Sequence, residues 1–312
     1  MVTSVETRQK PTIGPASLSP EWFAMRSKVI GSSEAAKAIG MSEYGTPLHV
    51  YKEKVGEIEP FQGNESTRRG RRYEPLIAED WQEVTGRTLR LYPCPMFLHP
   101  EYKGIAATPD GEVDDDEGLE IKSTTFRMKK NLGDEGTDDI PTDWLIQGQQ
   151  QMAVMGWKVV NFCVLVELEP TMYRVERNDT LIQLMIDAEL ELLERIRDRR
   201  PPEPNWEHSS TPRLIREIHS TINDTRIELN DQEIASWEKY ERIGRMIKKL
   251  DTKRDECKAR VLHGIGDHFA GLLGDGRMVR RKETKPQSYM VEKKGYIEAR
   301  ACKADDGRIV ER

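Results

Sequence analysis

The feature that most constrains how this chain can fold is a short alternation of apolar and polar residues at positions 119–123. Such alternation is typical of a half-buried strand, so Glu120 and Lys122 should project from the same face. An acidic run at 114–118 precedes it and supplies residues that favour a turn. We therefore expect a hairpin whose first strand brings Asp110 back beside Glu120.

This hairpin would concentrate two carboxylates and one ammonium group. Carboxylates held a few ångströms apart repel each other unless a cation lies between them, and oxygen ligands of this kind suit Mg²⁺ or Mn²⁺. The motif alone is only moderately specific, because short charged strands beside acidic turns are also common in surface hairpins. A metal site and a solvated hairpin both remain open at this point.

Three further motifs lie on either side of the hairpin. They are Arg26 with Gly31-Ser32-Ser33-Glu34, the segment Gly70-Arg71-Arg72-Tyr73-Glu74-Pro75, and Ile140-Pro141 through Trp144 with Gln147-Gly148-Gln149. Taken with the hairpin, these motifs resemble the YqaJ-like viral recombinase family, which includes lambda exonuclease and lies within the PD-(D/E)XK nuclease superfamily. The resemblance covers residues 20–206, with four separated motifs in the family's order and spacing.

The resemblance implies an α+β (mixed α/β) fold with a restriction-endonuclease-like core, in which helices flank a central mixed sheet. It also implies an active site whose catalytic residues are Glu74, Asp110, Glu120, Lys122 and Gln147. The cofactor would be Mg²⁺, with Mn²⁺ as an alternative, held by Asp110, Glu120, the carbonyl group of Ile121 and Glu74. Binding of the 5′-phosphate end of DNA falls to Arg26 and Ser33.

Several of these assignments have a structural alternative. Arg26 can be an ordinary surface charge and Ser33 a simple helix cap. The arginines that precede Glu74 can form a solvated face or contact DNA phosphates; they are Arg68, Arg71 and Arg72. The glutamines that follow Trp144 can form a polar helix face, and among them Gln149 is a weaker active-site candidate than Gln147.

The order of patterns along the chain predicts its organisation. We expect a disordered tail at 1–18, an exonuclease core at 19–206 and a C-terminal appendage at 207–312. Within the core, the predicted helices span 66–85, 142–156 and 180–199. The predicted strands span 88–92, 96–99, 104–107, 159–168 and 172–175.

Two local expectations can be compared directly with the structure. The helix at 66–85 should bury one stripe of side chains, which consists of Leu76, Ile77, Trp81 and Val84. Residues 127–140 are basic at first and then acidic and rich in glycine, which favours a mobile loop near the site.

Beyond Trp206 the composition changes. Apolar residues between Ile234 and Val261 follow one face of a predicted helix of roughly 30 residues. Residues 277–294 are then expected to form a basic hairpin. Its Arg280, Arg281 and Lys282 are candidates for gripping DNA, while subunit assembly, partner docking and a merely solvated hairpin stay open.

Composition limits the class of protein. The chain has 312 residues, 33% of them charged, and a net charge of −6. Ten acids fall in two loops at 112–117 and 134–143, and local potential rather than total charge determines whether phosphates are attracted. No apolar run approaches a membrane span. The four cysteines are scattered, so we expect a reduced, cytoplasmic compartment. The family resemblance implies that this is the cytoplasm of a bacterial host cell and that a phage or prophage encodes the protein.

These observations favour a metal-dependent 5′-to-3′ exonuclease that acts on linear double-stranded DNA and leaves single-stranded 3′ overhangs for phage-type recombination. The resemblance further implies a ring-shaped homo-oligomer and a single-strand annealing protein as partner. Two alternatives remain: an endonuclease with the same core that cuts DNA internally, and a non-catalytic DNA-binding or scaffold protein. The intact set of three acids and Lys122 argues against the second alternative.

Overall fold

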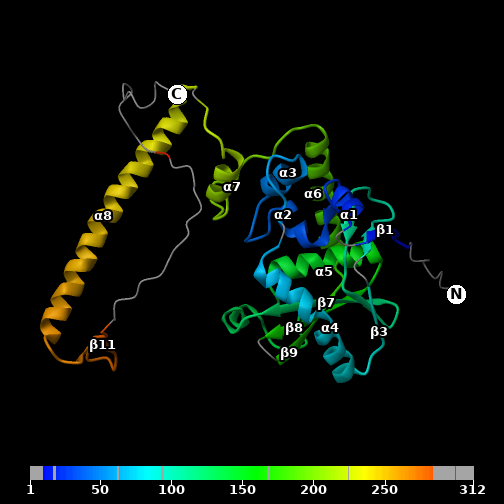
Figure 1. Cartoon of the computed structure of the whole chain (residues 1–312), viewed down its shortest axis with the longest axis horizontal. Helices are drawn as coiled ribbons and strands as arrows, with labels where there is room; N and C mark the ends of the chain where they lie inside the picture. The colour runs from blue at the N-terminus through cyan, green and yellow to red at the C-terminus, as the bar shows by residue number, and fades with distance from the viewer. Residues whose placement is uncertain are drawn as a thin grey trace. The chain divides into compact units, whose positions relative to one another are not determined.

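The computed structural model describes residues 10–16, 19–61, 63–92, 95–166, 169–223, 225–283 and 299, except for the side chains of 126–128. They belong to two compact units, 1–220 and 221–312, which are described separately (Figure 1). The first unit extends beyond the predicted boundary at 206, because helix α7 (Thr211–Ile218) buries Leu214 completely within it.

The first unit contains a five-stranded mixed sheet with the strand order β3-β6-β7-β8-β9. Its strands are β3 (Leu89–Leu91), β6 (Gly111–Val113), β7 (Glu117–Thr124), β8 (Val159–Val166) and β9 (Glu169–Glu176). Strands β7 and β8 run parallel, whereas the other pairs are antiparallel. The nearly continuous apolar sequence of β8 is explained by the burial of both its faces.

A second sheet of four strands has the order β1-β4-β5-β2. Its strands are β1 (Thr12–Ala16), β4 (Pro95–Leu98), β5 (Ile105–Ala107) and β2 (Ile30–Gly31). Strand β1 pairs antiparallel with β4, so the prediction of a disordered tail is wrong for residues 12–16. The rest of that predicted tail, apart from residues 10 and 11, lies outside the described residues.

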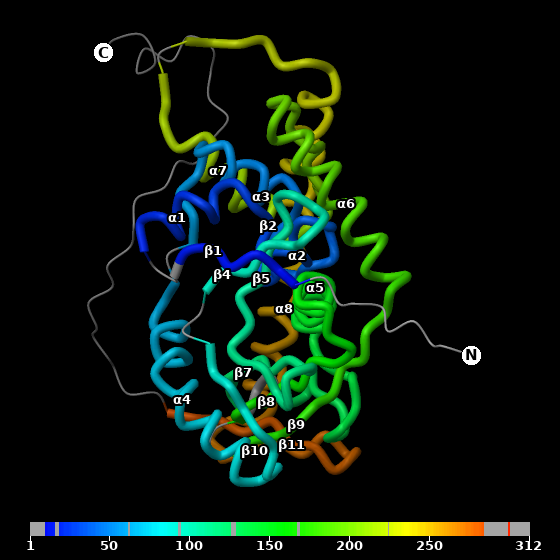
Figure 2. Tube along the Cα trace, turned by 90° about the vertical axis from the view of Figure 1, so that its right-hand side faces the viewer, coloured from blue at the N-terminus to red at the C-terminus, as the bar shows by residue number. Residues whose placement is uncertain are grey.

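Helix α5 (Thr142–Met155) lies between the two sheets (Figure 2). Gln150 Nε2 donates hydrogen bonds to the carbonyl groups of Ile30 and Ala106 in the second sheet, each at 3.0 Å. On the other side, Gln149 Nε2 donates to the carbonyl group of Glu176 at the end of β9, at 2.7 Å. The helix is therefore a buried element whose amides tie the sheets together, and the alternative of a solvated polar face is wrong.

Helix α4 (Glu65–Thr85) crosses one face of the first sheet. Asn64 caps its first turn, and Gly86 ends it in the left-handed conformation with φ 64°. Its buried residues are Ile77, Ala78 and Trp81, which pack with β7 and β8. The predicted burial of Leu76 and Val84 is wrong, because their side chains are 56% and 67% exposed.

The remaining helices of the first unit pack with the second sheet, with α5 and with one another. They include α1 (Pro20–Arg26), the 3₁₀ turn η1 (Ser32–Glu34), α2 (Ala35–Ala38), α3 (Pro47–Lys54) and α6 (Asp179–Arg197). A short 3₁₀ helix, η2 (Phe126–Asn131), follows β7. These helices bring the N-terminal motif with Arg26 next to the segment with Ser33.

The segment that follows η2 is hydrogen-bonded to strand β9. The backbone N–H of Gly136 donates to the carbonyl group of Met172 at 2.8 Å, and that of Arg174 donates to the carbonyl group of Thr137 at 3.1 Å. Tyr173 also donates from its hydroxyl group to the carbonyl group of Gly133. These bonds add backbone pairing to β9, in contrast to the expectation of a mobile loop.

The second unit contains the predicted long helix, α8 (Asp231–Ile265), followed by a hairpin of β10 (Ala270–Leu272) and β11 (Met278–Arg280). The hairpin begins earlier than predicted, and residues 284–294 lie outside the described part. Among all described residues, no helix has the length and apolar character needed to span a membrane.

Gly118 permits a close approach between β7 and Trp157. A Cβ atom at this position would lie 2.6 Å from the Trp157 ring. We predict that Gly118→Ala lowers the free energy of unfolding by about 1–3 kcal/mol, the usual cost of overpacking a core. Gly70→Ala is the control, because its Cβ would make an ordinary 3.4 Å contact with Ser123. Urea denaturation of the three proteins measures the effect; identical midpoints for Gly118→Ala and the wild type would contradict it.

Candidate functional site

The predicted hairpin exists and carries the candidate site. Strands β6 and β7 pair antiparallel with Gly111 opposite Leu119. Asp110 immediately precedes β6, and its Oδ2 accepts a hydrogen bond from the backbone N–H of Ile121 at 2.7 Å. This bond across the hairpin brings Asp110 beside the strand that carries Glu120, as the alternation predicted.

Glu120 is the best-bonded acid of the site. Its Oε1 accepts hydrogen bonds from Lys122 Nζ at 2.7 Å and from Gln147 Nε2 at 2.5 Å. Its Oε2 accepts a bond from Gln151 Nε2 at 2.6 Å. Lys122 Nζ also donates to Gln147 Oε1 at 2.9 Å, so the predicted group of Glu120, Lys122 and Gln147 is joined directly.

Glu74 and Asp110 face a common space. A cavity of about 100 Å³ is lined by Glu74, Pro75, Leu91, Tyr92, Asp110 and Ile121. Within the described part of the chain, neither acid forms an ion pair within 4.0 Å. Among the described residues, both acids therefore line one cavity without a direct ion pair.

The electrostatics of these acids follow from their surroundings. Burial and the nearby charge of Glu120 raise the pKa of Asp110 well above its ordinary value, although the Ile121 N–H and Lys122 act in the opposite direction. Burial and Glu120 likewise raise the pKa of Glu74, against the influence of Arg71 and Lys122. Like charges held together in this way are typical of a functional site.

The donor set suits a hard cation in part. Asp110, Glu74 and Ile121 are among the residues that line the cavity, and carboxylate oxygens such as those of the two acids are ligands that Mg²⁺ prefers. Among the described residues, however, no three Asp, Glu, His or Cys side chains stand ready arranged as a metal site. Glu120, the third acid of the hairpin group, accepts hydrogen bonds from Lys122, Gln147 and Gln151 instead.

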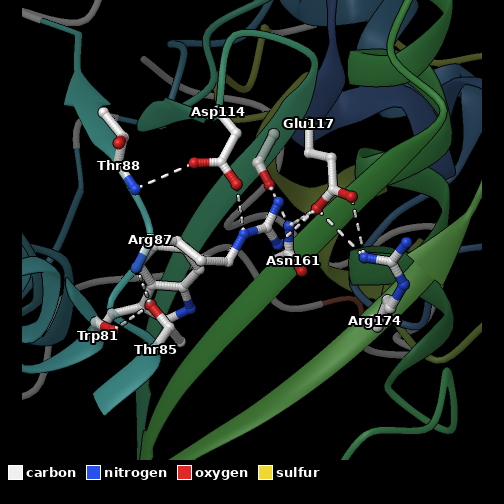
Figure 3. A network of polar contacts seen from close by, with 9 residues as sticks. Trp81, Thr85, Arg87, Thr88, Asp114, Glu117, Asn161 and Arg174 are labelled. Carbon is white, nitrogen blue, oxygen red and sulfur yellow. Dashed lines mark hydrogen bonds and ion pairs between the residues drawn. The ribbon is translucent and has the colours of Figure 1, made fainter. Parts of the chain in front are cut away.

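Two acids of the turn beside the site, Asp114 and Glu117, are paired with arginines (Figure 3). Arg87 Nε donates to Asp114 at 2.7 Å, and Arg87 Nη1 donates to Glu117 at 2.8 Å. Asn161 and Arg174 also donate to Glu117, at 2.8 and 3.1 Å. Burial alone would raise the pKa of Glu117, but these hydrogen bonds outweigh it and lower the pKa.

The hydrogen bonds around Arg87 also stabilise the turn between β6 and β7. Asp114 and Asp115 have positive φ values of 47° and 67°, a strained conformation for residues other than glycine. Thr88 and Asp114 exchange hydrogen bonds, since Thr88 N–H donates to the Asp114 carboxylate and Asp114 N–H donates to the Thr88 carbonyl group. Arg87 therefore ties the end of α4 to the hairpin, and it gave no recognisable signal in the sequence.

The two residues predicted to bind a 5′-phosphate come together. Arg26 Nη2 lies 3.5 Å from Ser33 Oγ, and the guanidinium group lies 5.1 Å from the centre of the Trp22 ring. Ser33 is not a helix cap, because Gly31 occupies the N-cap position of η1 and Glu34 occupies that of α2. The capping alternative for Ser33 is therefore wrong.

The arginines of α4 line a separate, larger hollow of about 650 Å³. It is bordered by Gly63, Asn64, Glu65, Thr67, Arg68, Arg71 and Arg72. Arg68 is paired with Glu65 at 2.7 Å. Arg71 and Arg72 have no ion pair within 4.0 Å among the described residues, so they are the better candidates for phosphate contact.

The arginines of the second unit differ in their surroundings. Arg280 lies over the Phe269 ring at 5.9 Å, and Arg281 donates to the carbonyl group of Gly266. Lys282 is exposed. Arg281 is thus partly engaged in holding the hairpin, and a DNA grip by these three residues stays a prediction.

One residue at the centre of the site was underestimated from sequence. Gln151 is fully buried and donates directly to Glu120, although it was not among the site residues predicted from the sequence. The signal was the i, i+4 spacing from Gln147. That spacing could not show that both amides reach one carboxylate.

The fold and site define a mixed α+β protein with acids, a lysine and buried glutamines gathered at a β-hairpin. Residues 21–158 match the YqaJ-like viral recombinase domain. This match confirms, over residues 21–158, the resemblance inferred from the motifs.

The chain is also similar to one curated protein and to solved structures of exonucleases. The uncharacterised protein YqaJ of Bacillus subtilis (strain 168) is 25% identical over 261 residues, which cover 82% of this chain and 81% of that protein. A crystal structure of an alkaline exonuclease from Laribacter hongkongensis superimposes with a TM-score of 0.49 and 23% identity, over 58% of this chain and 94% of that one. A phage-related exonuclease from Haemophilus somnus 129PT gives a TM-score of 0.40 and 14% identity, over 55% of this chain and 96% of that one.

The charge environment of Asp110 predicts a pH effect. When folding raises the pKa of a carboxyl group, ionisation of that group lowers the free energy of unfolding. The loss of stability develops as the pH rises from the ordinary pKa of the group through its raised pKa. Asp110→Asn should therefore raise the melting temperature of the metal-free protein at neutral pH by about 2 °C or more, and should flatten its decline with rising pH. Asparagine can still accept the Ile121 hydrogen bond.

Asp114→Asn is the control for this prediction. It is the same chemical change on the same hairpin, but it removes a carboxylate that is paired with Arg87. Its melting temperature should not rise. Thermal unfolding in EDTA between about pH 5 and pH 8 compares the proteins, and a lower melting temperature for Asp110→Asn throughout that range would contradict the assigned repulsion.

Proposed function

We propose that this protein is a metal-dependent nuclease that removes nucleotides from one strand of linear double-stranded DNA, starting at the 5′ end. The observation that carries the proposal is the group of Glu74, Asp110, Glu120 and Lys122 around one hairpin. The family match supports a role in DNA processing, since the domain is described as a viral recombinase. Mg²⁺ is the proposed cofactor, and Mn²⁺ is the alternative.

The residues fit this cofactor because two acids without a paired cation share a cavity and have raised pKa values. Asp110, Glu74 and the Ile121 carbonyl group would hold the ion, with Glu120 joining them after it exchanges part of its amide and lysine contacts. When bound, Mg²⁺ would supply Lewis-acid chemistry at the scissile phosphate.

Lys122 is suited to act on the reacting phosphate. Its side chain is 21% exposed and its Nζ is held between Glu120 and Gln147. An ammonium group fixed in this way can orient a water molecule and offset the negative charge that develops as the phosphodiester bond breaks. Gln147 and Gln151 would restrict the rotation of Glu120, so that the lysine and the acid keep their relative positions.

The 5′ polarity rests on Arg26 and Ser33. A guanidinium group can bond two oxygens of a terminal phosphate at once, and a hydroxyl group beside it adds another donor. Within the described residues, Arg26 has no carboxylate within 4.0 Å. It is thus free of an ion pair that a phosphate would have to displace.

The proposal extends to the setting of the enzyme. A nuclease that exposes 3′ single strands suits phage-type recombination, with a single-strand annealing protein as partner and a bacterial cytoplasm as location. A ring-shaped homo-oligomer around the DNA would keep the enzyme on one strand. The family description supports the recombination role, while the oligomer and the partner come from the resemblance.

Nuclease activity and its mode are tested with two DNA substrates. Release of nucleotides from end-labelled linear duplex should require Mg²⁺ and stop in EDTA. Covalently closed circular duplex should stay intact under the same conditions. Cutting of the circle would replace the exonuclease by an endonuclease of the same core, and digestion that continues in EDTA would remove the metal from the proposal.

Lys122→Met tests the chemistry. We predict a loss of cleavage rate of about 10²-fold or more, the usual effect of removing one group that stabilises developing charge. Duplex binding should survive, because the substitution keeps the length of the side chain. Lys103→Met removes an exposed lysine away from the hairpin and is the control. A Lys122→Met rate within about tenfold of wild type would rule out the assigned role.

Arg26→Ala tests the polarity. The wild type should digest 5′-phosphorylated linear duplex faster than the 5′-hydroxyl form, and Arg26→Ala should remove most of that preference while metal-dependent cleavage stays detectable. Lys28→Ala, which removes an exposed cation two residues later, is the control. Initial rates on the two substrates measure the effect, and a variant that keeps the full preference would place the 5′-end pocket elsewhere.

A further inference from the structure

A buried ion pair lies behind Arg26 and Ser33. Lys54, the last residue of α3, and Glu34, the last residue of η1, approach to 2.5 Å between Nζ and Oε1. Their side chains are only 5% and 6% exposed. Neither residue is part of the group around Glu120, and the proposed chemistry does not use them.

Each member of the pair also holds a backbone group of the pocket. Lys54 Nζ donates a hydrogen bond to the carbonyl group of Arg26 at 2.7 Å. Glu34 Oε1 accepts a hydrogen bond from the Gly31 N–H at 2.9 Å. The pair thus spans the gap between the end of α1, which carries Arg26, and the turn that carries Ser33.

The surroundings make Lys54 the balancing cation of this pair. Glu189 is 1% exposed, and neither of its oxygens has a hydrogen-bond partner among the described residues. Burial and the charge of Glu34 raise the pKa of Glu189 well above its ordinary value, which favours the uncharged form of its carboxyl group. Burial and Glu34 also raise the pKa of Glu53, while Lys37, Lys54 and Arg26 lower it.

Stability alone does not account for the pair. Two charges taken out of water cost several kcal/mol each, and replacing a buried pair by apolar groups of similar volume is often neutral or stabilising. What apolar groups could not provide is the hydrogen bond from Lys54 to the Arg26 carbonyl group. That bond fixes the backbone from which the guanidinium group reaches towards Ser33.

We propose that Glu34 and Lys54 are positioning residues that hold Arg26 against Ser33 as a preformed site for a terminal phosphate monoester on DNA. The inference rests on the proposed function for its ligand. The pair does not touch the phosphate. It acts by keeping the two donor side chains at one place before the DNA end arrives, which lowers the cost of ordering them on binding.

The test uses the double variant Glu34→Gln/Lys54→Met in the full chain. It removes both charges together, so that no unpaired charge is left beside Glu189. Glutamine can still accept the Gly31 hydrogen bond, whereas methionine cannot donate to Arg26. Lys52→Met is the matched control, because it removes a lysine of the same helix whose partner is Glu57 at the surface.

Two measurements are made on each protein. The first is the ratio of initial rates on 5′-phosphorylated and 5′-hydroxyl duplex. A general loss of stability would lower both rates equally and would leave this ratio unchanged. The second is amide hydrogen exchange of the segment 26–34. We expect the rate ratio of the double variant to be about tenfold lower than that of the wild type, which is the effect of weakening one hydrogen bond to a charged group. We also expect the amides of this segment to exchange faster in the double variant.

The outcomes separate this inference from the proposed function. A folded double variant that keeps both the ratio and the exchange rate overturns the inference, and so does a double variant that fails to fold, since the pair would then serve the fold itself. If the wild type shows no preference for a 5′-phosphate, the proposed polarity fails; faster exchange in the double variant would still show that the pair positions Arg26 and Ser33.

Discussion

The carboxylate of Glu120 joins the parts of the first unit that the candidate site requires. It lies on β7 and accepts hydrogen bonds from Lys122 on the same strand and from Gln147 and Gln151 on α5. Because Gln149 and Gln150 of the same helix bond the backbone of both sheets, the orientation of this one acid is coupled to the packing of the whole unit. A buried acid is tolerated here because each of its oxygens has a donor.

The other charges of the site are arranged in two different ways. The acids of the hairpin turn are paired with arginines, as Arg87 shows with Asp114 and Glu117. Asp110 and Glu74 have no ion pair within 4.0 Å among the described residues, and burial together with the charge of Glu120 raises their pKa values. The paired acids therefore stabilise the turn, whereas Asp110 and Glu74 are the acids that the proposed function assigns to the metal ion.

Much of the site could be predicted because it depends on local patterns. The alternation around Glu120 predicted its shared face with Lys122, and turn residues predicted the return of Asp110. Predictions that depended on neighbouring elements were less accurate. Leu76 and Val84 fit a helical stripe but are exposed, because the first sheet covers only a narrow face of α4. Residues 12–16 were assigned to a disordered tail, since a strand at the edge of a sheet is decided by its partner β4.

The sequence by itself determined the hairpin, the long helices, the apolar strand β8 and the identity of the acids and the lysine that meet at the hairpin. Local backbone preferences and side-chain periodicity suffice for these features. Only the tertiary structure decided that the three consecutive glutamines at 149–151 are buried, that Arg87 pairs with Asp114 and Glu117, and that Lys54 reaches the Arg26 carbonyl group. Each of these depends on contacts between residues far apart in the chain, and periodicity carries no information about which distant groups satisfy a buried polar atom.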